Sequence, residues 1–145
     1  YNYGAENYPR VKETENMAIK YAGLFAIIVF IIILTFARPI VAVFTNDAVV
    51  IQDTPSALRW VFAASPIIAV QLIGAAYFQA AGKATKALLL TLTKQGFFLI
   101  PLVLTLPHFF GIFGVWVSFP IADILSTIVT GVFLKKEMSE HLKEA

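Results

Sequence analysis

Apolar residues gather into four long blocks along this chain, and short polar stretches separate the blocks. Each block is long enough to cross a hydrocarbon layer of about 30 Å, which takes about 20 helical residues. An isolated strand cannot cross lipid, because its backbone N–H and C=O groups would find no partners there. The pattern therefore predicts four membrane-spanning helices, at residues 17–44, 56–81, 84–106 and 112–134.

The polar stretches between the blocks are typical of loops and turns. Asn46 and Asp47 can cap a short helix, and Thr54 is a predicted N-cap with Pro55 at the first position of the second span. Gly and Pro mark two further connections. The predicted segments outside the spans are a loop at 1–16, an outer loop at 45–55, a turn at 82–86, an outer turn at 107–111 and a tail at 135–145.

Composition excludes a soluble globular domain. Of the 145 residues, 59% are apolar and only 14% are charged, whereas soluble domains have about 45–50% and about 25%. The chain has no cysteine, which excludes disulfides and thiolate metal sites. His108 and His141 are far apart and lack ligand partners at metal spacing. We therefore expect no catalytic residues, no metal site, no cofactor and no nucleic-acid partner.

Lys and Arg residues are distributed unequally between the two predicted membrane faces. One face carries only Arg38 and Arg59. Because basic residues collect on the cytoplasmic side, the other face is predicted to be cytoplasmic, with both ends of the chain and the 82–86 turn. Its basic residues are Arg10, Lys12, Lys20, Lys83, Lys86, Lys135, Lys136 and Lys143. The chain is thus expected to be a multi-pass protein of the cell membrane.

Two charged residues lie at membrane depth. Counted from the cytoplasmic ends of their spans, Lys94 lies ~12 Å deep and Asp123 ~17 Å deep, at 1.5 Å per residue. An unpaired charge at such depth costs several kcal/mol, so these residues usually face the bundle interior or a wet cavity. We expect Lys94 and Asp123 to face each other or a shared aqueous cavity. A purely structural ion pair, or a Lys94 that snorkels to the interface, is the alternative.

Weaker candidates for a substrate or ion pathway are Gln71, Gln95 and Phe78. Gln71 and Phe78 share one helical face by their spacing. Amides also form ordinary hydrogen bonds between membrane helices, which is the simpler interpretation.

Three spans contain a central proline, at Pro66, Pro101 and Pro120. Each proline removes a backbone hydrogen bond and is expected to kink its helix. Their similar depth suits helices bent around a cavity, as in alternating-access transporters. Mere irregularity of packing is the alternative.

Two further patterns concern the helix surfaces. In the second span, the spacing of Ala76 and Ala80 permits close contact between helices. In the tail, the i,i+4 pairs Lys136/Glu140 and Glu137/His141 predict a solvated helical extension.

Four segments resemble, in order, parts of the multidrug and toxic compound extrusion (MATE) family. "YNYGAENYPRVKE" is similar to the loop after the family's eighth helix, and "ARPIVAVFTND" to the end of its ninth. "QLIGAAYFQAAGKATKALLL" resembles the tenth helix running into the eleventh, and "GVWVSFPIADIL" the twelfth. By this resemblance the first residues are a cytoplasmic loop inside a longer protein rather than a true N-terminus.

The resemblance implies a twelve-helix exporter of which this chain is the last four helices. Such a protein moves cationic amphipathic drugs outwards across the bilayer in exchange for protons or sodium, typically in the bacterial cytoplasmic membrane. The chain's partners would be lipid, the preceding eight helices and the drugs, and the fragment alone would not transport. Some branches carry an acidic residue shortly before a Gln like Gln71, but residues 67–70 here are apolar. Asp123, the carboxylate at membrane depth, is therefore the candidate for contact with the coupling ion.

Three alternatives stay open at this point. A lipid-linked oligosaccharide flippase has a related architecture. A membrane-embedded enzyme would need reactive groups at matching depth, for which Lys94 with Asp123 is the available pair. A structural subunit of four helices is the third.

Overall fold

The computed structural model describes residues 1–141, and side chains as far as Glu140. Every regular element in this range is helical. The elements are α1 (Tyr8–Phe44), α2 (Ala48–Val61), a 3₁₀ turn η1 (Ser65–Ile67), α3 (Ile68–Ala80), α4 (Ala84–Leu92), a π-helical segment η2 (Thr93–Leu99), α5 (Ile100–Thr105), α6 (Pro107–Phe110) and α7 (Ile112–His141).

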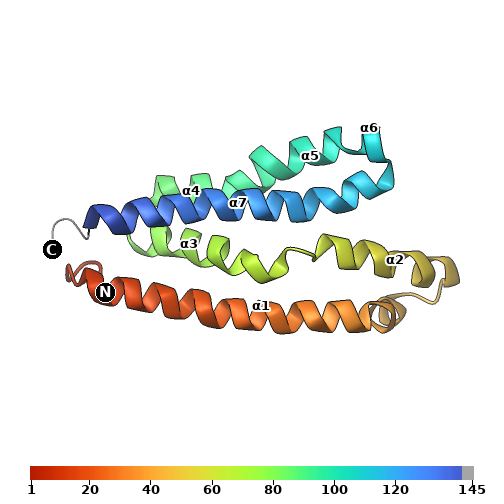
Figure 1. The fold of residues 1–145 in the computed structure, drawn as a ribbon, viewed down its shortest axis with the longest axis horizontal. Coiled ribbons are helices and arrows are strands. Elements are labelled where there is room, and N and C mark those ends of the chain that lie inside the picture. Colours follow the sequence, from red (N-terminus) through yellow and green to blue (C-terminus); the bar gives the residue numbers. More distant parts are fainter. Residues whose placement is uncertain (142–145) are drawn as a thin grey trace.

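These elements form four columns that are long and apolar enough to cross a membrane, namely Tyr8–Phe44, Ala48–Ala80, Ala84–Phe110 and Ile112–Glu140. The columns run side by side along the long axis of the molecule (Figure 1). α3 packs against α1, α4 and α7, while α7 also packs against α2 and η2. The N-terminus, the α3–α4 turn and the end of α7 lie together at one end, which we call the terminal end. The predicted all-α transmembrane fold class is confirmed.

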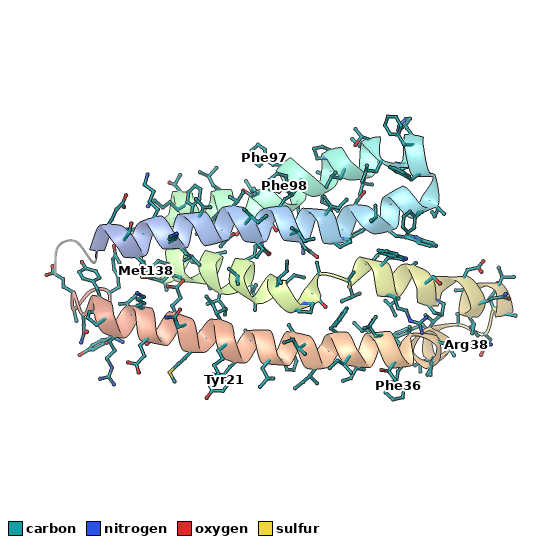
Figure 2. All side chains as sticks on the ribbon, in the orientation of Figure 1. Tyr21, Phe36, Arg38, Phe97, Phe98 and Met138 are labelled. Atoms are coloured by element: carbon teal, nitrogen blue, oxygen red, sulfur yellow. The ribbon has the colours of Figure 1, made fainter. Side chains whose placement is uncertain are left out.

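Large apolar side chains cover the outside of the bundle. Figure 2 shows Tyr21 and Phe36 pointing away from the bundle on α1, with Phe97 on the opposite side. All three are exposed in the isolated chain. An apolar surface of this extent needs lipid or other membrane helices to cover it.

The helix ends differ from the sequence prediction at several places. α1 begins at Tyr8, so only residues 1–7 form the predicted 1–16 loop. Asp47 caps α2 by accepting from the Val49 N–H at 2.8 Å, so most of the predicted 45–55 loop is helical. Thr54 is therefore not an N-cap, and Pro55 lies inside α2. α7 continues past residue 134 into the predicted tail. Hydropathy marks where a helix leaves the lipid, not where its backbone stops being helical.

The predicted proline kinks are only partly present. Pro66 lies in η1, where the second column is interrupted between α2 and α3, and Pro101 is the second residue of α5, which follows η2. Pro120, in contrast, lies inside the unbroken α7. A kink that the sequence analysis did not predict occurs at Phe36, whose φ and ψ are −110° and 19°. Pro39 accounts for it, because in a regular helix its ring would clash with the carbonyl four residues earlier.

Neighbouring helices supply donors to carbonyls beside these irregular points. The Thr127 hydroxyl on α7 donates to the Ile67 carbonyl at 3.4 Å, next to the interruption at η1. Arg59 Nε on α2 donates to the Leu34 carbonyl at 3.1 Å, beside the kink of α1. Such donors are needed because lipid offers none.

α3 and α7 pack closely against each other at Gly74. A Cβ atom on Gly74 would clash with Thr130 Cγ2 and would lie 3.0 Å from Leu134 Cδ1. Ala76 and Ala80, predicted to allow close contact, are exposed instead. The contact with α7 thus lies on the opposite face of α3 from the predicted one, because Gly74 and Ala76 are about 200° apart around the helix.

Candidate functional site

Lys94 and Asp123 form an ion pair inside the bundle. Lys94 Nζ on η2 lies 2.6 Å from Asp123 Oδ1 on α7. The Asp123 side chain is 4% exposed and the Lys94 side chain is 25% exposed. The predicted contact between the two residues is therefore confirmed, and the carboxylate has one lysine as its ionic partner among the described residues.

Lys94 belongs to the π-helical segment η2, an irregularity that the sequence analysis missed. In this segment the Ile100 N–H donates to the Gln95 carbonyl, five residues back. π-helical segments are rare and frequently occur at functional sites. Pro101 lies two residues after the end of this segment and has no N–H, so the normal hydrogen-bond register cannot continue across it. Pro101 was the available sequence signal, although a proline by itself does not distinguish a π segment from a kink.

The other predicted pathway residues differ in how exposed they are. Gln71 is half-buried on α3, and Gln95 is exposed on η2. Phe78 is fully buried in the core with Leu90 and Leu134. Phe78 thus packs in the core of this chain, and its role as a pathway residue stays a prediction.

A second ionic site, which the sequence analysis missed, lies at the terminal end. The Glu137 side chain is 0% exposed, and its Oε2 accepts from Lys86 Nζ at 2.9 Å. Its Oε1 accepts from Lys83 Nζ. The prediction of a solvated tail is therefore wrong at Glu137, although Lys136 and Glu140 are exposed as expected. The predicted partner His141 lies outside the described side chains.

Aromatic rings lie next to the charged groups of this second site. The Tyr3 ring centroid lies 5.3 Å from Lys83 Nζ and 6.3 Å from the Tyr77 ring centroid. Burial lowers the pKa of the Lys83 ammonium, but hydrogen bonds to Glu137 and Tyr3 outweigh it and raise the pKa above its ordinary value. Lys83 therefore stays charged at neutral pH.

A cavity of about 310 Å³ opens beside the second site, between the N-terminal loop, α1 and α3. Its lining includes Tyr3, Glu15, Ile73 and Tyr77. Glu15 is buried, and its Oε1 has no hydrogen-bond partner among the described residues. A carboxylate beside aromatic rings is the combination that attracts organic cations.

Comparison with known proteins identifies the family. The family model MatE matches residues 1–105. No curated protein matched the chain. Among solved structures, a ligand complex of the MATE multidrug transporter DinF-BH shares 45% sequence identity and a TM-score of 0.86, covering 94% of this chain.

Two further structures are described as outward-facing and inward-facing conformations of a multidrug resistance MATE family transporter of the MOP superfamily. They share 26% and 25% identity with this chain, cover 98% of it and both have a TM-score of 0.92. The chain spans 30% of the DinF-BH chain and 32% and 33% of the other two. By its sequence match and by its fold, this chain belongs to the MATE family of transporters.

Proposed function

We propose that the transporter of which this chain forms part exports cationic amphipathic drugs by antiport with protons or sodium. In this proposal Asp123 contacts the coupling ion, Lys94 is its resting partner, and the predicted cytoplasmic side is the terminal end. The observation that carries the proposal is the Lys94–Asp123 ion pair, 2.6 Å long, inside a chain of the MATE family. An ionisable pair at membrane depth is typical of a proton or ion pathway.

The geometry of the pair suits exchange. A proton or a sodium ion that binds Asp123 removes the attraction that holds Lys94, so the two cations compete for one carboxylate. Lys94 is partly exposed and belongs to a π-helical segment, whose hydrogen bonds differ from those of the α-helix on either side. It can therefore leave Asp123 with less disruption than a lysine in a regular buried helix.

The cavity at the terminal end suits the substrate. Its volume of about 310 Å³ lies at the lower limit of the range of about 300–1,000 Å³ for drug-sized ligands. Glu15 would attract the positive charge of the drug, and the Tyr3 and Tyr77 rings would contact its apolar body. A cavity on the predicted cytoplasmic side would receive drugs before export.

The test uses the full-length transporter in proteoliposomes with a fluorescent cationic drug. Imposing a pH gradient or a sodium gradient should drive drug movement, and drug addition should drive movement of the same ion. Glu15→Gln should raise the drug concentration needed for half-maximal transport. Drug movement that depends on neither gradient would overturn antiport. Movement of a lipid-linked oligosaccharide instead of the drug would favour a flippase.

A further inference from the structure

The second ionic site connects separate parts of the chain at the terminal end. Glu137 belongs to α7, Lys83 to the α3–α4 turn, and Lys86 to α4. Each oxygen of the buried carboxylate accepts from its own lysine. Because removing a carboxylate from water is costly unless it is fully paired, this arrangement fixes α7 relative to the turn.

Tyr3 brings the N-terminal loop into the same site. The loop is held in shape by its own backbone, since the Ala5 N–H donates to the Tyr1 carbonyl at 3.0 Å and the Asn7 N–H to the Asn2 carbonyl at 2.9 Å. The Tyr3 ring contacts Lys83 and packs edge-on against Tyr8 and Tyr77. This is the segment whose sequence resembles the family, and transport chemistry at Asp123 does not explain it.

The arrangement of the four columns is compatible with two states of a related transporter. The chain matches the outward-facing and the inward-facing structure with the same TM-score of 0.92. A unit that fits both states equally well does not need to rearrange internally between them. Contacts within this unit must then hold its helix ends together while the rest of the transporter moves.

We propose that Tyr3, Lys83, Lys86 and Glu137 form a clamp that positions the N-terminal loop, the α3–α4 turn and α7 as one unit in both states. Glu137 is the central positioning residue, because both lysines converge on it. The clamp explains why a glutamate in a polar tail is completely buried. It rests on family membership, and only its effect on transport rests on the proposed function.

The test measures a distance across the clamp in the full-length transporter, in a background without other cysteines. Spin labels are placed at Ala5→Cys in the loop and Lys135→Cys on α7, both of which are exposed positions. The unmodified clamp should give one narrow distance distribution that is the same under conditions favouring the inward-facing and outward-facing states. Glu137→Gln and Tyr3→Ala should each add a broad population at longer distance.

Matched controls come from the same elements. Tyr1 lies in the same loop but is fully exposed, and Glu140 lies one turn after Glu137 on α7 and is also exposed. Tyr1→Ala and Glu140→Gln should leave the distribution narrow. A narrow, unchanged distribution in Glu137→Gln would overturn the clamp.

Two additions keep the test decisive. If Glu137→Gln does not fold, Lys83→Gln replaces it. This variant retains the Lys86–Glu137 contact, so it should broaden the distribution less, and no broadening would again overturn the proposal.

Drug transport is measured on the same variants and should fall in Glu137→Gln but not in Glu140→Gln. Because the distance measurement needs no substrate, a clamp that behaves as expected in a protein that moves no drug would contradict only the proposed function.

Discussion

α7 carries two buried carboxylates with different surroundings. Asp123 and Glu137 are 14 residues apart in sequence, or about 21 Å along the helix at 1.5 Å per residue. Among the described residues, Asp123 has a single lysine partner, on the irregular segment η2. Glu137 has two lysine partners, one in the α3–α4 turn and one on α4, and an aromatic ring closes the site.

This difference agrees with the two proposed roles, ion exchange at Asp123 and positioning of helices at Glu137. Both carboxylates are buried, so burial alone does not distinguish the two proposed roles. A carboxylate with one partly exposed partner can accept a competing ion. A carboxylate whose two oxygens are both occupied by lysines is instead suited to fixing helices in place.

The largest expected effect comes from removing both lysines of the clamp. Lys83→Met with Lys86→Met removes the two lysine contacts of the buried Glu137 carboxylate. Breaking a buried ion pair in this way costs about 3–5 kcal/mol, so the thermal unfolding temperature of the purified transporter should fall strongly. Lys83→Met alone should lower the unfolding temperature by less than half as much, because Lys86 remains. Equal losses in the single and double variants would contradict the shared role of the lysines.

An intermediate effect is expected at Gly74, which faces Thr130, midway between the two carboxylates in sequence. Gly74→Ala places a Cβ atom too close to the Thr130 and Leu134 side chains, and overpacking of this kind costs about 1–3 kcal/mol. The unfolding temperature should fall, and Thr130→Ala should restore part of it by removing the nearest atom. Gly131→Ala is the control, since a Cβ atom there meets nothing within 4 Å. If Gly74→Ala were as stable as this control, α3 and α7 would not pack as described.

The smallest effect is expected for the exposed pair on α7. Lys136 Nζ and Glu140 Oε1 are 4.0 Å apart, and the two side chains are 76% and 54% exposed. Exposed pairs at i,i+4 contribute about 0.3–0.5 kcal/mol. Glu140→Gln should therefore leave the unfolding temperature nearly unchanged at moderate salt. A fall in the unfolding temperature as large as that of the clamp variants would contradict this expectation. Exposed and buried charges on this helix would then contribute equally to stability.

The sequence was sufficient to predict the four spans and the Lys94–Asp123 contact. Both predictions follow from the cost of exposing polar groups to lipid, which leaves few solutions for a charge at membrane depth. The clamp could not be predicted in the same way. Glu137 lies in a stretch rich in charged residues, where solvation is the simplest expectation, and its burial depends on tertiary contacts with Lys83 and Lys86.

The helix irregularities show a similar limit. The sequence shows where a proline removes a hydrogen bond, but neighbouring contacts decide whether the backbone breaks, tightens or continues. Pro66, Pro101 and Pro120 accordingly lie in a 3₁₀ turn, after a π segment and inside an unbroken helix, respectively. A local pattern cannot distinguish these outcomes.

The most direct test of the functional assignment is ion exchange in the full-length transporter carrying Asp123→Asn. The substitution keeps the shape of the side chain and removes the charge that pairs with Lys94 and that we propose binds the coupling ion. Drug-dependent proton or sodium exchange in proteoliposomes should be lost, while Glu140→Gln, which also removes a carboxylate from α7, should exchange normally. Unchanged exchange in Asp123→Asn would contradict the account and reduce Asp123 to a structural partner of Lys94.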